Sequence, residues 1–164
     1  MGLDQFLNWL QETPIAVAIR EHEILFPWTE SFHVLAIVLV VGTISIVDLR
    51  LLGLASRNRA VTALMREVLP YTWAALLVAL ITGSLLFSSN ATKYAHNFYF
   101  EAKMALLAIA ACNVAVFHLI GAGDIVRWDA AGKSPVGAKT AGGISLLIWI
   151  AVVVSGRWIG FTLH

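Results

Sequence analysis

Residues 30–54 read ESFHVLAIVLVVGTISIVDLRLLGL, an apolar stretch with His33 near its start and with Asp48 and Arg50 near its end. About 20 helical residues cross the hydrocarbon core of a bilayer, so the stretch predicts a transmembrane helix. Ionisable side chains inside such a helix are costly, usually face the interior of a bundle and often mark functional sites. The stretch therefore predicts a membrane protein whose interior contains polar groups.

The composition of the whole chain agrees with this prediction. Of 164 residues, 59% are hydrophobic and only 13% are charged, against roughly 25% charged in an ordinary soluble domain. The mean hydropathy is +0.81. A net charge of +1 with scattered basic residues gives no nucleic-acid surface. The single cysteine, Cys112, excludes an internal disulfide and any metal site built from several cysteines.

Four apolar stretches are long enough to cross a membrane, and short polar or glycine-rich loops separate them. We expect the spans at about residues 31–54, 71–87, 98–120 and 142–163. Short connections make consecutive helices antiparallel neighbours. The predicted fold is therefore all-α, an up-down four-helix membrane bundle over residues 29–164.

Residues 1–28 form a separate amphipathic segment. Apolar side chains recur at helical spacing over residues 3–10, between polar ones, and Pro27 and Trp28 precede the first span. Such a segment is typical of a helix lying in the membrane interface. It either rests on the membrane surface or folds back as a lid over the bundle. The N-terminus lacks the pattern of a cleaved signal peptide.

The positions of lysine and arginine predict the orientation, because cytoplasmic loops carry an excess of them. The loop after the first span, with its flank, contains four arginines, and the loop before the fourth span contains three basic residues. The loop after the second span and the N-terminal segment contain one each, and the C-terminal tail contains none. We therefore expect both termini outside the cell membrane.

The polar side chains of the spans fall at two depths, which follow from the helical rise of 1.5 Å per residue. His33, Lys103 and Arg157 lie in the outer half, and Arg50 and His118 lie near the inner ends. The two histidines differ in depth by roughly 20 to 28 Å. They cannot be the two axial ligands of one haem in a straight bundle.

Two haem arrangements remain open. In the first, His33 ligates haem b in the outer half, with His96, Met104 or water opposite, and Lys103 and Arg157 pair its propionates. In the second, His118 ligates a haem at the inner end, with Arg50 near the propionates. Neutral imidazole is a good iron ligand, and the axial ligands set the potential of the haem.

The same side chains also have structural interpretations, in which they pair with neighbouring polar groups. The candidate pairs are His33 with Glu30 or a backbone carbonyl, Arg157 with Glu101, Asp48 with Arg50, and His118 with Asp48. In this interpretation Lys103 extends outward to the interface, and Asn113 forms a hydrogen bond between helices.

Three segments resemble a widespread bacterial family of small four-helix membrane proteins without an established activity. They are IREHEILFPWTESFHVLAIVLVVGTISIVDLRLLGL (19–54), FEAKMALLAIAACNVAVFH (100–118) and SGRWIGF (155–161). The resemblance implies a bacterial inner-membrane protein, and His96 is not part of the family's pattern. The characteristic polar positions that it carries over are His33, Asp48, Arg50, Lys103, Asn113, His118 and Arg157.

More distantly, the layout resembles haem-binding four-helix membrane proteins, which include bacterial protoporphyrinogen oxidase and copper-resistance membrane domains. The shared features are a histidine that opens one span and a lysine-containing span that ends near a histidine. The resemblance implies haem binding.

Three functions follow from these observations. The leading hypothesis is a membrane-embedded b-type haem protein, acting in electron transfer or as the membrane subunit of a redox complex. The alternatives are a non-redox accessory subunit of a larger membrane assembly, and a small enzyme or carrier for a quinone, porphyrin or lipid. In the last case Glu101, Lys103 and Arg157 would form an anion site. Expected partners are the bilayer, other redox subunits or a second copy of the chain.

Overall fold

The computed structural model describes residues 2–121, 125–130 and 134–163, except the side chains of residues 118, 120, 121, 126, 127 and 130. These residues form helices and connecting turns, with no strand among them. The helices are α1 (Leu3–Gln11), α2 (Pro14–Glu21), α3 (Leu25–Leu52), α4 (Val61–Ser89), α5 (Ala91–Ala95), α6 (Phe98–Gly121), α7 (Ile125–Ala130) and α8 (Val136–Thr162). The prediction of an all-α protein is confirmed.

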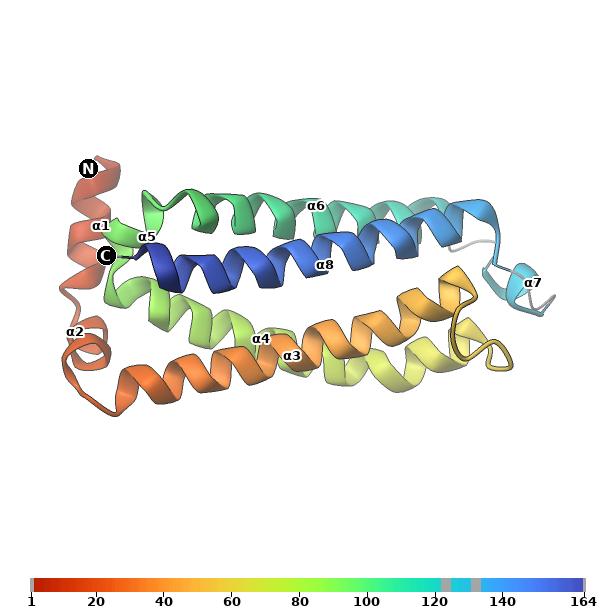
Figure 1. The fold of residues 1–164 in the computed structure, drawn as a ribbon, viewed down its shortest axis with the longest axis horizontal. Coiled ribbons are helices and arrows are strands. Elements are labelled where there is room, and N and C mark those ends of the chain that lie inside the picture. The colour runs from red at the N-terminus through yellow and green to blue at the C-terminus, as the bar shows by residue number, and fades with distance from the viewer. Residues whose placement is uncertain (1, 122–124, 131–133, 164) are drawn as a thin grey trace.

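Four of these helices, α3, α4, α6 and α8, are long and apolar enough to cross a membrane. They run along the long axis of the molecule, and both chain termini lie at the same end of it (Figure 1). That end, which also holds α1, α2 and α5, is called the α1–α2 end below, and the opposite end is called the α7 end. This arrangement is the predicted four-span membrane bundle.

Three of the long helices, α3, α4 and α8, begin before the predicted spans. Helix α4 begins at Val61 rather than at residue 71, and Pro70 lies inside it. The polar residues before Pro70 were expected to be a loop, because their composition does not fit a bilayer. These residues are instead the first turns of α4. Its first backbone amides, which have no partner within the helix, bind the carboxylate of Asp129 on α7.

The N-terminal segment folds over one end of the bundle. Helices α1 and α2 lie across the ends of the long helices instead of running alongside them (Figure 1). Their buried residues are Leu7 of α1 and Ala16 and Ile19 of α2. The guanidinium of Arg20 donates hydrogen bonds to the carbonyl of Gln11 at 3.1 Å and to that of Ser89 at 3.2 Å. Helices α1 and α2 thus fold back over this end of the bundle.

The bundle is built from two helix pairs. Helix α3 packs against α4, α6 packs against α8, and contacts between α3 and α8 join the pairs. A central apolar cluster lies at this junction, with Val40 of α3 and Ile148, Trp149 and Val152 of α8 among its buried members. A second buried cluster of Leu51, Val61 and Ala138 lies near the α7 end.

A close approach of α3 and α8 depends on Gly142. A Cβ atom at this position would lie 3.1 Å from the backbone oxygen of Asp48 and 3.1 Å from Cβ of Leu51. Both are rigid parts of α3, so an added methyl group would force the helices apart. At the neighbouring Gly143, a Cβ atom would meet only the end of the Leu52 side chain, at 3.7 Å.

We therefore predict that two neighbouring alanine substitutions differ in their effect on stability. Gly143→Ala gains up to about 1 kcal/mol of helix propensity. Gly142→Ala makes the same gain but also overpacks the interface, so it should be less stable than Gly143→Ala by about 1 to 3 kcal/mol. Unfolding of both variants in mixed detergent micelles would measure the difference. Equal stability would mean that the two helices separate without cost.

Candidate functional site

The polar site in the half of the bundle nearer α1 and α2 is built around His33. Its ring is partly buried, and Nδ1 lies 3.0 Å from Oγ1 of Thr82 on α4. Thr82 donates its own hydroxyl proton to the carbonyl of Val78 at 2.7 Å. The hydroxyl can then only accept, so His33 donates through Nδ1–H. This tautomer has its free lone pair on Nε2.

The ring of His33 also interacts with the backbone carbonyl of Ala79 on α4, and among the described residues no side chain forms a hydrogen bond with Nε2. The next residue after Thr82 makes room for the ring, since a Cβ atom at Gly83 would lie 2.9 Å from Cε1 of His33. Of the two structural partners expected for His33, the backbone carbonyl is present, that of Ala79 on α4, and a hydrogen bond with Glu30 is not formed. Thr82 and Gly83 thus hold the ring with one nitrogen bound and the other available.

Lys103 belongs to the same half of the bundle. Its Nζ atom lies 3.5 Å from the position of a Cβ atom on Gly156 of α8, and its charge acts on the ring of His33. Lys103 therefore turns toward the neighbouring helix and does not extend outward, contrary to the structural interpretation of the sequence. His33 and Lys103 therefore lie in the same half of the bundle.

Arg157 and Glu101, which were expected at the same depth, form no hydrogen bond or ion pair with His33 or Lys103. Arg157 is exposed, and its Cζ atom lies 4.7 Å from the ring centroid of Phe161. Glu101 is exposed as well. No ion pair joins these two side chains, both of which the structure describes. The expected pair is therefore wrong, because Arg157 lies over an aromatic ring, and an anion site of Glu101, Lys103 and Arg157 is not assembled.

His96 has its own partners at the surface. Its Nδ1 atom lies 2.9 Å from the carbonyl of Thr92, and Nε2 lies 3.8 Å from Oδ1 of Asp4. Its side chain is 63% exposed. His96 is thus a poor candidate for the ligand opposite His33. On the short helix before His96, α5, the pKa of Tyr94 is raised, mainly by burial and to a smaller extent by the negative charge of Glu30.

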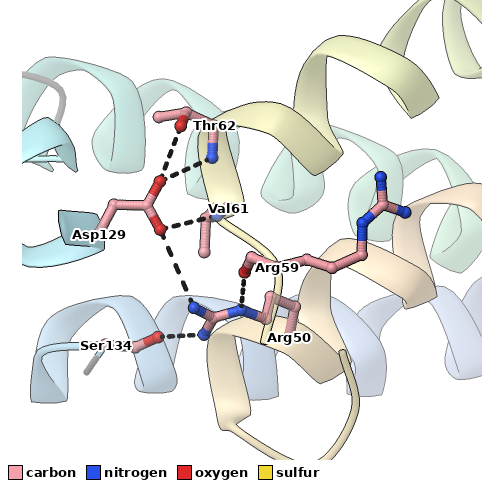
Figure 2. A network of polar contacts seen from close by, with 6 residues as sticks. All are labelled: Arg50, Arg59, Val61, Thr62, Asp129 and Ser134. Carbon is pink, nitrogen blue, oxygen red and sulfur yellow. Dashed lines mark hydrogen bonds and ion pairs between the residues drawn. The ribbon is translucent and has the colours of Figure 1, made fainter. Parts of the chain in front are cut away.

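At the α7 end, the structure forms a buried network around Arg50. The side chain is 3% exposed, although arginine is almost never fully buried without partners. Nε donates to the carbonyl of Arg59 at 2.7 Å, one terminal nitrogen lies 3.5 Å from Oγ of Ser134, and the other lies 3.9 Å from Oδ1 of Asp129. Figure 2 shows these three partners around the guanidinium.

Asp129, on α7, connects this network to the start of α4. Its Oδ1 accepts a hydrogen bond from the amide of Val61 at 2.7 Å, and Oδ2 accepts from the amide and the hydroxyl of Thr62 at 3.0 and 2.7 Å (Figure 2). The first amides of a helix have no partner within the helix. Ala60, at the N-cap position, has no side chain that could bind them. Asp129 therefore caps α4 from a distant part of the sequence.

The environment of Asp129 favours the charged form. Burial by itself raises the pKa of this carboxyl group, but the hydrogen bonds from Thr62 and Val61 and the charge of Arg50 outweigh it, and the pKa falls below its usual value. Asp129 is thus an ionised partner of Arg50. The expected pair of Arg50 with Asp48 is not formed, because the guanidinium of Arg50 binds the carboxylate of Asp129 and the carbonyl of Arg59 instead. The same partners enclose it, so Arg50 does not fit a role beside haem propionates.

Two further predicted positions, His118 and Asn113, lie on α6. The backbone of His118 lies on α6, but its side chain is outside the described residues. Asn113 donates a hydrogen bond to the carbonyl of Ala141 on α8 at 3.1 Å, which confirms its expected role between helices. Within the described residues, no group of three or more histidine, cysteine or acidic side chains could hold a metal ion.

Fold and site together define a four-span integral membrane protein with separate polar sites at the two ends of its bundle. The chain belongs to a family of unknown function, DUF6644, whose model matches residues 6–162. No curated protein and no solved structure gives a significant match to the chain.

Proposed function

We propose that the protein is a membrane-embedded b-type haem protein, acting in electron transfer or as the membrane subunit of a redox complex. The observation that supports the proposal best is the state of His33. Histidines that bind metals almost always donate their other ring N–H to a fixed acceptor, which sets the tautomer and the direction of the ring. The contact with Thr82 is such an arrangement, and it leaves Nε2 for iron.

Lys103 supports the same proposal through its charge. A haem carries two propionate groups, and a cation turned into the bundle gives one of them a partner near His33. When bound, the haem would supply a reversible one-electron change at its iron. His33 would be one axial ligand of this haem.

The proposal includes an orientation. The α7 end is the more basic one, because residues 55–70 and 121–141 contain six of the eight lysines and arginines outside the predicted spans. By the positive-inside rule that end faces the cytoplasm. Both termini, the α1–α2 cover and the His33 site would then lie toward the outer face of a bacterial inner membrane.

The ultraviolet–visible spectrum of the detergent-purified protein, made in haem-replete cells, tests this function. We expect a Soret band that is lost in His33→Ala and retained in His96→Ala, the surface control. A colourless, correctly folded wild-type protein would contradict the proposal. Loss of the band in His118→Ala, with His33→Ala unaffected, would instead support a haem at the α7 end.

A second candidate function is an accessory subunit of a larger membrane assembly. Only 6% of the apolar window of α6 is buried within the chain, the smallest share of the four spans. A helix so little covered by its own chain has surface available for another subunit. Extraction of the chain with a mild detergent as part of a fixed, colourless complex would favour this function over haem binding. Isolation as a stable haem-containing monomer would count against it.

A further inference from the structure

Asp48 is a buried acid that the proposed haem site does not use. It lies four residues before the end of α3, which corresponds to about 6 Å along the helix axis. Its backbone faces Gly142 of α8, where a Cβ atom would lie 3.1 Å from the oxygen and 3.5 Å from the Cα atom of Asp48. The residue is only 5% exposed, a degree of burial that aspartate almost never reaches without a partner.

The carboxyl group of Asp48 is incompletely satisfied. The hydroxyl of Ser145 on α8 interacts with it. The Oδ2 atom is buried and has no hydrogen-bond partner among the described residues. An ionised carboxylate accepts hydrogen bonds at both oxygens and is costly to bury without them. A protonated carboxyl group has no charge to compensate, so this surrounding suits the acid form.

The charged groups on the neighbouring elements do not reach Asp48. On α3 itself, Arg50 is directed to Asp129 and Arg59. On α4, which packs against α3, Arg66 and Glu67 are exposed.

The remaining neighbours of α3 add no charge either. On α8, the basic residue of the first turns, Lys139, is exposed, and Ser145 is uncharged. Helix α2 packs at the far end of α3, where His33 and Lys103 also lie. The His118 side chain on α6 is outside the described residues. No described cation compensates a negative charge on Asp48.

Apolar layers separate Asp48 from both ends of the bundle. The cluster of Val40, Trp149 and Val152 lies on the side toward the α1–α2 end. The cluster of Leu51, Val61 and Ala138 lies on the side toward the α7 end. The short distance to the end of α3 makes the α7 end the easier route for a proton.

We propose that Asp48 is a proton-binding site inside the membrane, with Ser145 as its hydrogen-bond partner, and that it exchanges its proton with the α7 end. A metal cation is a poorer occupant. Hard cations need about six oxygen ligands, whereas the described surroundings of Asp48 contribute one carboxyl group and one hydroxyl. The site goes beyond haem binding, and its test does not need haem.

Infrared difference spectroscopy of the whole protein in lipid vesicles tests the proposal. Subtracting the spectrum of Asp48→Asn from that of the wild type should leave a carbonyl stretching band of a protonated carboxylic acid at neutral pH. The band should shift in D₂O, because the proton exchanges. Asparagine resembles a neutral acid in shape, so Asp48→Asn should fold. Asp129→Asn is the matched control, since Asp129 is ionised and contributes no such band.

Three results would overturn the proposal. Absence of the band in the wild type at neutral pH would mean that Asp48 is ionised. A band that does not shift in D₂O would make Asp48 a sealed structural acid that exchanges no proton. Loss of the band when sodium replaces a bulky organic cation at constant pH would assign the site to a metal cation.

Discussion

Replacing Asp129 with alanine should lower the free energy of unfolding by about 3 to 5 kcal/mol, the range for removing one partner of a buried ion pair. The side chains of Asp129 and Arg50 are each 3% exposed, so the arginine would keep its charge in a buried place. The same substitution removes three hydrogen bonds from the start of α4. Unfolding by a denaturing detergent in mixed micelles would measure the loss.

A matched control separates burial from charge pairing in general. Glu67 also pairs with an arginine, Arg59, but its side chain is 59% exposed. Exposed pairs contribute little to stability, so Glu67→Gln should be indistinguishable from the wild type. Equal losses of unfolding free energy in Asp129→Ala and Glu67→Gln would show that the buried network contributes no more to stability than an exposed ion pair.

The pH dependence of the difference gives a further check on Asp129. Its pKa in the folded state lies below the ordinary value of 3.8, so folding favours the ionised form. The contribution of the charge is complete at pH values above the unfolded pKa and is lost as the pH falls through the folded pKa. The stability difference between the wild type and Asp129→Asn should therefore be constant above about pH 5 and should narrow in more acidic solution.

The fold could be predicted because its determinants are local. Four long apolar runs predict four membrane helices whatever their neighbours are, and Figure 1 shows the expected bundle. The start of α4 could not be predicted in the same way, because its cap comes from Asp129, far along the chain. The one local signal was negative: Ala60 cannot cap a helix, so α4 needs an acceptor from elsewhere.

The candidate site was predicted only in part, for a related reason. Depth along the helices identified His33 and Lys103, because the helical rise fixes depth. The direction of each side chain around its helix depends on packing, which the sequence does not give. Arg157 was therefore assigned to the interior, although it is exposed. The role of Thr82 was missed because a threonine in an apolar helix usually bonds only to its own backbone.

The second large effect concerns this threonine and rests on the proposed haem function. Thr82→Val should reduce the affinity for haem about ten- to a hundredfold, as expected when the partner that orients a metal-binding histidine is removed. Valine has nearly the shape of threonine but cannot accept the proton of His33 Nδ1. The ring would then lose both its fixed direction and the preference for a free Nε2. Titration of haem into the haem-free protein, followed at the Soret band, would measure the affinity.

Two comparison variants make the result specific to the contact with His33. Thr82→Ser keeps the hydroxyl and should bind haem nearly as the wild type does. Thr29→Val removes a hydroxyl that bonds only to the Leu25 carbonyl of its own helix, so it tests the general cost of losing a threonine hydroxyl from a span. If Thr82→Val binds haem as tightly as Thr29→Val while His33→Ala does not bind it, His33 is a ligand whose direction is set by packing against Gly83. If all four variants bind haem equally, the ligand lies elsewhere in the chain, and the hydrogen bond between His33 and Thr82 serves only to join α3 to α4.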